Sequence, residues 1–431
     1  MLFRSGPVDA VGITNQRAST VLWERSTGRP LAPALGWQDL RTVGECIAAR
    51  AEHGIALAPN QTATKAQWLL KTHASGRDPA DLCLGTVDSW IAWILSGPDR
   101  LHVTDHSNAA VTGLATMHDG APRWNERVAA AMGVEPVMLP SIVPSSGAIG
   151  LAHALPGAPP ITAIAGDQQA SLMGQSCVRP GMAKCTFGTG GMLDLLTGDE
   201  PPRSAERTSH GTFPIVAWSF GDRLTWGAEA IMLSAGTCVE WLRDDMGLIG
   251  SADESHDVAS AVESSEGVVF VPALLGLATP RWDYGARGAL LGLTRGTTRH
   301  HVVRAVLEGV AQRGTDLLEA ALADHPELTV EEVRIDGGMS RNPTFVGALA
   351  DATGRPVSVA PITEATTLGA AFLAGLAVRT WTGLDDVAAA WHPLHTVEPR
   401  SGFDRTASRQ VWAEAVTRAA GWIPDLSALD F

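Results

Sequence analysis

The stretch VRIDGGMSRNP, residues 333–343, decides the fold class of this chain. Val333–Ile335 has the composition of a buried strand, Asp336-Gly337-Gly338 forms a turn, and Asn342-Pro343 predicts the cap and first position of a helix. Upstream of this stretch, apolar residues fall on one face of a long helix, at Val303, Leu307, Val310, Leu317 and Ala321. Strands that alternate with helices indicate an α/β fold with mixed sheets.

The pattern continues toward the N-terminus. Val8–Thr14 and Ile161–Gly166 are apolar runs typical of buried strands, and Gly181–Phe187 with Met192–Leu196 predict a hairpin. Helices are expected at 40–52, 66–75 and 86–95. A stretch rich in proline and glycine, Leu139–Pro160, is predicted to be a loop that contains the boundary between two domains, residues 1–155 and 156–431.

Composition excludes several classes of protein. The 431 residues carry a formal net charge of -14, which argues against nucleic acid and anionic membrane surfaces as partners. Five scattered cysteines without a CxxC pair predict reduced thiols in a cytoplasmic protein. The first residues lack the apolar core of a signal peptide, and no apolar run is long enough to span a bilayer.

Asp167 follows the strand Ile161–Gly166 directly, in the sequence AGDQQ. A carboxylate at the end of such a strand could accept a proton from a substrate hydroxyl during phosphoryl transfer. Gln168 beside it offers both a hydrogen-bond donor and an acceptor to a neighbouring hydroxyl. The alternative is that Asp167 only caps the helix beginning at Gln168, and the sequence leaves both open.

Two glycine-rich segments could hold phosphate. In Phe187-Gly-Thr-Gly-Gly191, glycines allow backbone N–H groups to approach an anion and Thr189 adds a hydroxyl, although a plain hairpin turn uses the same residues. In 336–343, a capped turn explains Asn342 and Pro343 but leaves Gly337 and Gly338 unexplained, and a nucleotide lying across the turn would account for them.

A fourth group lies near the N-terminus, at Thr14–Arg17 and Trp37–Arg41. Arginine and amide side chains at a strand end can bind polyol oxygens, and Trp37 could pack on the carbon skeleton of a substrate. The alternative is a set of unrelated polar surface residues.

Read together, these segments resemble the FGGY family of carbohydrate kinases, and within it the members that phosphorylate glycerol. The resemblance runs in one order along most of the chain, through GITNQR (12–17), WQDLRT (37–42), TKAQWLL (64–70), GTVDSWIAWILSG (85–97), HVTDHSNAA (102–110), AGDQQASLMGQ (165–175), GMAKCTFGTGG (181–191), FVPALLGLATPRWD (270–283), RGALLGLTRG (287–296), DGGMSRNP (336–343) and EATTLGAAFLAG (364–375). It implies two domains of the actin/hexokinase type (ribonuclease H-like), each a mixed sheet flanked by helices, with the active site in the cleft between them.

The resemblance also implies roles for particular residues. Asp167 would be the catalytic base and would lie near Mg²⁺. Arg17, Trp37 and Gln168 would line the site of a small polyol or sugar. ATP would meet Gly188 and Thr189 at its phosphates, and it would be bordered by the residues Gly236, Glu240, Gly338 and Asn342. Many members of the family form dimers or tetramers, so the resemblance leaves open that this chain forms a homo-oligomer.

Three positions depart from the glycerol-phosphorylating pattern. Ala18 replaces a glutamate that binds glycerol hydroxyls, and Asn60 and Met192 replace aromatic residues of the substrate site. Losing a charge-assisted hydrogen bond costs about 1.5–3 kcal/mol, so we expect a polyol or sugar other than glycerol. Glu240 replaces a glutamine near the nucleotide.

The family's opening Asp-x-Gly-Thr strand and turn has no counterpart before Val11, so the N-terminal domain is expected to lack its first strands. We expect the 431-residue chain to be poorly stable and nearly inactive for that reason. This leaves an alternative function, a catalytically impaired protein that binds a sugar or a nucleotide. An actin-like or chaperone-type ATPase is disfavoured, because Arg17, Trp37, Asp167 and Gln168 have no role there.

Overall fold

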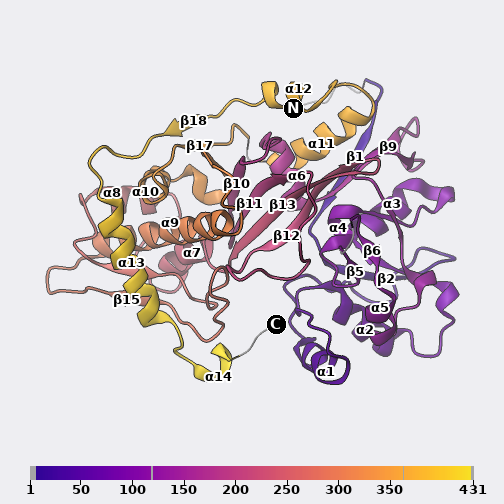
Figure 1. Cartoon of the computed structure of the whole chain (residues 1–431), viewed down its shortest axis with the longest axis horizontal. Helices are drawn as coiled ribbons and strands as arrows, with labels where there is room; N and C mark the ends of the chain where they lie inside the picture. The colour runs from indigo at the N-terminus through magenta and orange to yellow at the C-terminus, as the bar shows by residue number, and fades with distance from the viewer. Residues whose placement is uncertain (1–5, 118–119, 363, 429–431) are drawn as a thin grey trace.

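A mixed sheet of ten strands runs through the centre of the molecule (Figure 1). The structure is a computed structural model that describes residues 6–117, 120–362 and 364–428. The strand order is β1-β9-β8-β12-β13-β11-β10-β16-β17-β18. The bounds are β1 (Val11–Asn15), β8 (Ser146–Leu151), β9 (Pro160–Gly166), β10 (Ala183–Phe187), β11 (Gly191–Gly198), β12 (Phe213–Phe220), β13 (Arg223–Met232), β16 (Val333–Asp336), β17 (Val357–Val359) and β18 (His395–Val397).

The strand directions gather several strand ends at one edge of the sheet. β1 pairs parallel with β9 in the register Asn15↔Gly166, and β10 pairs parallel with β16 in the register Thr186↔Asp336. Following the parallel and antiparallel pairings across the sheet, β1, β9, β13, β10 and β16 all point the same way. Their carboxyl ends therefore meet at a single edge, where ligands of such sheets commonly bind.

Helices cover both faces of this sheet. The long helix α9 (Arg299–Asp324) and α10 (Pro343–Thr353) pack on one face, in a core that contains Ala183, Cys185 and Phe187 of β10. Since successive side chains of a strand point to opposite faces, Lys184 and Thr186 face the other way, toward α6 (Asp167–Gly174).

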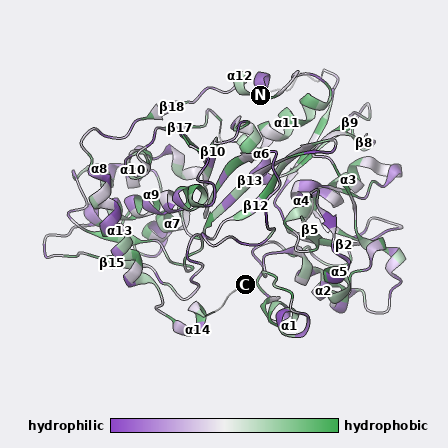
Figure 2. Cartoon of the chain, in the orientation of Figure 1, coloured by the Kyte–Doolittle hydropathy of each residue, from purple (hydrophilic) through white to green (hydrophobic). Residues whose placement is uncertain are grey.

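Helices α6 and α11 (Ala365–Ala377) lie on this second face and cross each other closely. The approach depends on two glycines, because a Cβ on Gly369 would overlap the backbone of Ala170 and a Cβ on Gly174 would overlap the backbone of Ala365. Apolar colour concentrates on α11 and the central strands in Figure 2.

The remaining elements surround the sheet. Within the part of the chain that the structure describes, four two-stranded sheets are formed by β2 (Thr20–Glu24) with β3 (Leu82–Thr86), β4 (Val103–Asp105) with β7 (Ser141–Val143), β5 (Ala115–Thr116) with β6 (Arg123–Trp124), and β14 (Val269–Val271) with β15 (Ala289–Leu291). The other helices are α1 (Val43–His53), α2 (Thr62–His73), α3 (Val87–Ser96), α4 (His106–Ala110), α5 (Glu126–Ala131), α7 (Gly236–Asp244), α8 (Glu254–Ser260), α12 (Leu384–Ala390), α13 (Arg405–Ala419) and α14 (Pro424–Ser427), with short 3-10 turns η1 (Pro79–Asp81), η2 (Gly97–Asp99), η3 (Pro136–Met138) and η4 (Gly338–Arg341).

The long helix, the 161–166 strand, the 181–196 hairpin and the strand-turn-helix at 333–343 are confirmed. The loop expected at Leu139–Pro160 is wrong in part, because β7 and β8 lie within it. Two glycines in the sequence SGAIGL weaken the strand signal of β8, which forms because it pairs with β9. No helix in the described ranges has the length and apolar character to cross a bilayer.

Candidate active site

Arg17 and Asp167 meet where the neighbouring strands β1 and β9 end. The Arg17 Nε atom lies 3.4 Å from Asp167 Oδ1, and Arg17 Nη2 lies 2.7 Å from Glu229 Oε2 on β13. A Cβ on Gly166 would come within 2.7 Å of Cγ and Cδ of Arg17, so the glycine is what allows the arginine side chain to lie across the end of β9. Arg17 thus links three strands at this edge.

Asp167 is the first residue of α6, and the cap position belongs to Gly166. Its Oδ1 accepts a hydrogen bond from the Gln168 backbone N–H at 2.9 Å. The side chain nevertheless stays 34 % exposed, whereas that of Arg17 is 10 % exposed. The hydrogen bond from Gln168 N–H therefore leaves the Asp167 carboxylate partly exposed and accessible to a ligand.

Charge in this region is unbalanced. Two buried cations, Arg17 and Lys184, interact with the carboxylates of Asp167, Asp194, Glu229 and Asp336. Burial would lower the pKa of Arg17, but Glu229, Asp167 and Asp194 outweigh it and raise the pKa. Burial raises the pKa of Glu229 to about 7 despite its ion pair with Arg17. The site thus has more acidic than basic groups, a charge balance that favours binding of a cation.

Lys184 and Asp194 form a second ion pair, 2.7 Å long, in which both side chains are fully buried. Lys184 also donates to Gln168 Oε1 at 2.6 Å and to Thr186 Oγ1 at 3.0 Å. The sequence analysis missed this pair and Glu229. Counting outward from the turn of the predicted hairpin, with Phe187 opposite Met192, would have placed Lys184 opposite Leu195. The strands adopt a register one residue different, with Phe187 opposite Gly191, and this pairs Lys184 with Asp194.

Met192 is brought to this cluster, with its Sδ 3.8 Å from Arg17 Nη2. Trp37 and Asn60 reach it only indirectly. Trp37 is 36 % exposed, and its backbone N–H donates to Ser19 Oγ at 3.1 Å. Asn60 is exposed, next to Pro59, whose carbonyl accepts from Lys65 Nζ at 2.8 Å.

The carbonyl of Ala18 links these segments. It accepts hydrogen bonds from the hydroxyls of Thr20 and Thr62, at 3.2 and 3.1 Å. Thr62 begins α2 and lies two residues beyond Asn60, so this bond holds the start of α2 against the residue that follows Arg17. Ala18 itself has a φ of 59°, in the left-handed region.

The residues expected to bind the nucleotide meet around the turn 188–190. Gly236 N donates to Gly188 O at 2.8 Å, and Ala235 N donates to Thr189 O at 2.9 Å, which fixes the start of α7 against the turn. Glu240 is exposed on α7 one turn beyond Gly236. Gly337 lies against the backbone of Phe187, and this brings the start of η4 beside the same turn.

Asn342 follows the 3-10 turn η4 and directly precedes α10. It caps α10 by accepting from Phe345 N at 3.1 Å, as the sequence predicts, and its amide donates to Ser255 Oγ of α8 at 2.8 Å. The N-terminus of α10 thus lies at this edge, and helix N-termini favour anions.

The glycines of this region divide into two kinds. A Cβ on Gly190, Gly236 or Gly337 would strike backbone atoms, and Gly337 also has a φ of 86°, so packing or conformation requires these three. A Cβ on Gly188 or Gly338 would meet nothing within 4 Å, and neither has positive φ. Internal packing does not require glycine at Gly188 and Gly338, which is the pattern expected where a ligand approaches the backbone.

Two of the acidic side chains at this edge, Asp167 and Asp336, are candidates for holding Mg²⁺. Asp336 is buried, its Oδ2 accepts from Ser171 Oγ at 3.0 Å, and its Oδ1 has no hydrogen-bond partner. In the described part of the chain, no group of three or more His, Cys, Asp or Glu is arranged to hold a metal ion. Mg²⁺ in kinases is commonly held by one or two carboxylates together with substrate phosphates, and Asp167 and Asp336 fit that arrangement.

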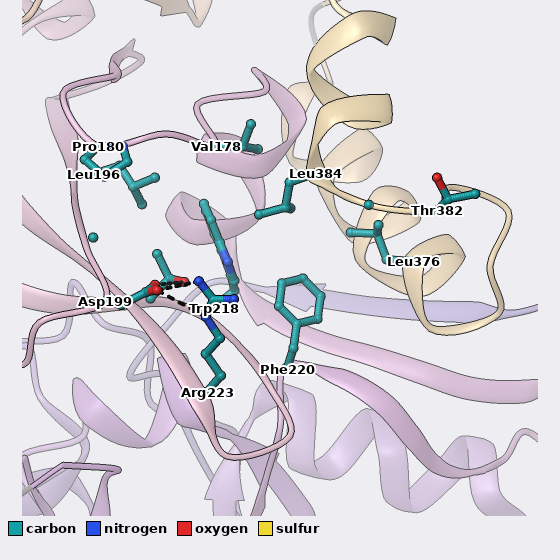
Figure 3. A pocket seen from close by; sticks show the side chains of 13 residues that line it. Val178, Pro180, Leu196, Asp199, Trp218, Phe220, Arg223, Leu376, Thr382 and Leu384 are labelled. Atoms are coloured by element: carbon teal, nitrogen blue, oxygen red, sulfur yellow. Dashed lines mark hydrogen bonds and ion pairs between the residues drawn. The ribbon is translucent and has the colours of Figure 1, made fainter.

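A separate pocket of about 460 Å³ lies at the opposite edge of the sheet (Figure 3). Leu196 and Gly198 line it where β11 ends, whereas Met192 lies at the start of β11, about 20 Å away for six strand residues. Trp218, Phe220 and Leu376 add apolar walls, and Asp199 pairs with Arg223 at its side. None of the residues expected to bind substrate or nucleotide lines this pocket.

Comparisons with known proteins agree along most of the chain. Residues 3–174 match the N-terminal domain, and residues 183–378 the C-terminal domain, of the FGGY family of carbohydrate kinases. A glycerol kinase of Aromatoleum aromaticum is 43 % identical over 96 % of this chain and 85 % of its own length. A glycerol kinase of Trichlorobacter lovleyi is 42 % identical with the same coverage.

Solved structures agree with this assignment. The glycerol kinase of Plasmodium falciparum with ADP superposes with a TM-score of 0.87 at 30 % identity, covering 96 % of this chain and 84 % of that one. A xylulose kinase of Lactobacillus acidophilus, 20 % identical, shares the fold with a TM-score of 0.81 over 96 % of this chain and 84 % of its own. The expected two-domain actin/hexokinase-type fold is thereby confirmed. The chain belongs to the FGGY family of carbohydrate kinases, enzymes that use ATP to phosphorylate a hydroxyl group.

Proposed function

We propose that this protein transfers the γ-phosphoryl group of MgATP to a hydroxyl of a small polyol, with Asp167 as the base. The observation that carries the proposal is the accessible carboxylate of Asp167 beside Arg17, at the same sheet edge as the turn 188–190. Enzymes catalyse phosphoryl transfer mainly by positioning the reactants and stabilising charge. A cation, a carboxylate and a glycine-rich turn at one edge of the sheet can do both.

On the substrate side, Asp167 accepts the proton of the attacking hydroxyl as the oxygen bonds to phosphorus and the bond to ADP breaks. Arg17 compensates the charge of the base and donates to substrate oxygens. Gln168 binds a neighbouring oxygen, and Met192, Trp37 and Asn60 border the carbon chain.

On the nucleotide side, Gly188, Thr189 and Gly338 offer backbone N–H groups and a hydroxyl to the phosphates. Gly236, Glu240 and Asn342 border the rest of the nucleotide, where α7 and α10 begin. Asp167 and Asp336 would hold Mg²⁺, which would neutralise charge on the phosphates. A closed cleft excludes water, so that the polyol and not water attacks the phosphate.

Glycerol is the first substrate to examine, because relatives at 42–43 % identity are glycerol kinases. The comparisons lend no support to a substrate other than glycerol. Ala18 still removes one carboxylate acceptor from the glycerol-binding pattern, and we therefore propose weaker glycerol binding than in those relatives. Reduced, buried cysteines and the use of MgATP support a cytoplasmic location.

The test is ADP release from MgATP by the 431-residue protein across a panel of glycerol, longer polyols and ketoses. The proposed function predicts polyol-dependent turnover that falls by about 10²–10⁴-fold in Asp167→Asn, the contribution typical of a general base. The expectation of a nearly inactive chain predicts instead that the unsubstituted protein shows no turnover in this assay. Gly347→Ala, inside α10 at a position where a Cβ would meet nothing within 4 Å, serves as the matched control. Polyol or MgATP binding without turnover would favour the alternative of a non-catalytic binding protein.

A further inference from the structure

Lys184 is a buried cation whose contacts are all within the protein. Its ammonium group has three N–H bonds, and three acceptors take them: Asp194 Oδ2, Gln168 Oε1 and Thr186 Oγ1, at 2.7, 2.6 and 3.0 Å. The side chain is fully buried. With every donor used and no exposed surface, Lys184 cannot act on a substrate directly.

Its position in the sheet explains how it remains charged. In the strand register Asp194 lies between Lys184 on β10 and Glu229 on β13. Burial would lower the pKa of Lys184, but the carboxylates of Asp194 and Asp336 outweigh it and raise the pKa. A buried ion pair adds little stability over apolar residues of similar volume, so its value lies in the geometry that it specifies.

That geometry determines the orientation of the Gln168 amide. An ammonium group only donates hydrogen bonds, so the oxygen of the Gln168 amide must point toward Lys184. The amide nitrogen must then point away from Lys184. The backbone of Gln168 is held as well, because its N–H donates to Asp167 Oδ1 at 2.9 Å.

We infer that Lys184 is a positioning residue that fixes Gln168 as a hydrogen-bond donor to the substrate. The inference deepens the proposed function and rests on it. A substrate must then present an acceptor oxygen next to the hydroxyl that is phosphorylated. A methyl ether at that oxygen keeps the acceptor, whereas a deoxy compound loses it.

The experiment is a cycle of variants measured on the intact chain. Lys184→Met alone would leave Asp194 buried without a partner and could unfold the protein, so the pair Lys184→Met/Asp194→Leu removes both charges together. This pair, Gln168→Ala and their combination are compared with the wild type for KM of the polyol, KM of ATP, kcat and thermal midpoint.

We expect the charge-pair variant and Gln168→Ala each to raise KM for the polyol by about 3- to 10-fold, the loss of one hydrogen bond. Their combination should raise it no further than Gln168→Ala does, because both substitutions remove the same substrate hydrogen bond. The wild type should accept the methyl ether better than the deoxy polyol, and the charge-pair variant should lose that preference.

Two outcomes overturn the inference and differ from each other. If the wild type phosphorylates polyols but the KM effects multiply in the combined variant, or the folded charge-pair variant keeps its KM, Lys184 does not act through Gln168 and the proposed function stands. If the wild type neither binds nor phosphorylates any polyol, the proposed function and this inference fail together.

Discussion

Replacing Gly369 with alanine tests whether the crossing of α6 and α11 fixes the structure as described. A Cβ at Gly369 would lie 2.6 Å from Ala170 C and 2.8 Å from Gly174 N, and closer still to the Ala170 carbonyl oxygen. All three atoms belong to the backbone of α6, so no side-chain rotation can make room. The two helices would have to separate, and Asp167 at the start of α6 would move with them.

Two opposing effects set the change in the free energy of unfolding that Gly369→Ala causes. Overpacking a tight interface costs about 1–3 kcal/mol, and a backbone obstacle calls for the upper end. Alanine in a helix interior is favoured over glycine by about 1 kcal/mol. We therefore expect Gly369→Ala to lower the free energy of unfolding by about 2 kcal/mol net, with a loss of turnover as the base is displaced.

Gly347→Ala is the matched control. Gly347 lies inside α10, and a Cβ there would meet nothing within 4 Å, so only the helix preference acts and the protein should gain about 0.5–1 kcal/mol. Urea midpoints of the two variants and the wild type, followed by circular dichroism, give the comparison. Equal stabilisation by both substitutions would show that α6 and α11 are not in backbone contact, and the reasoning would be refuted.

Three further predictions concern the site and its surroundings. Ala18→Glu should lower KM for glycerol by about tenfold or more in steady-state assays, because it restores a carboxylate acceptor; an unchanged KM would show that Ala18 does not face the substrate. Gly337→Ala should raise KM for ATP by displacing the turn beside Phe187, and a variant with wild-type KM for ATP and wild-type stability would contradict that placement. Burial raises the pKa of Asp88 to about 7 from an ordinary value near 4, so the folded protein retains a proton that the unfolded chain releases, and stability falls as pH rises from about 4 to 7. Asp88→Asn should flatten urea midpoints across pH 5–7, and a profile as steep as that of the wild type would mean that another group is responsible.

Much of the fold could be predicted because its elements carry local signals. The strand before Asp167, the hairpin around Thr189 and the long helix α9 have clear periodicity, and their bounds agree with the structure to within a few residues. β8 was not predicted, because it contains two glycines and depends on pairing with β9. Long-range pairing of this kind leaves no trace in a local pattern.

The candidate site could be predicted only in part, for the same reason. Asp167 and Gly188 lie in motifs that point to chemistry within a few residues. Glu229 and Asp194 lie in strands with no such motif, and Lys184 lies in the segment GMAKCTFGTGG (181–191) with nothing local to identify its partner. The three residues meet because β10, β11 and β13 are neighbours in the sheet. The roles of all these residues stay predictions until the variants are measured.

Successive side chains of β11 point to opposite faces of the sheet, and this limits how the hairpin can change in evolution. Asp194 faces Lys184 while Leu193 and Leu195 belong to the core against α9. Deleting a single residue between the turn and Asp194 would exchange these faces, placing a carboxylate against α9 and leucines against α6. We expect this hairpin to tolerate point changes at Gly188 and Thr189 of its turn, and to reject odd-numbered deletions within the strand, when a library of variants is selected for folding.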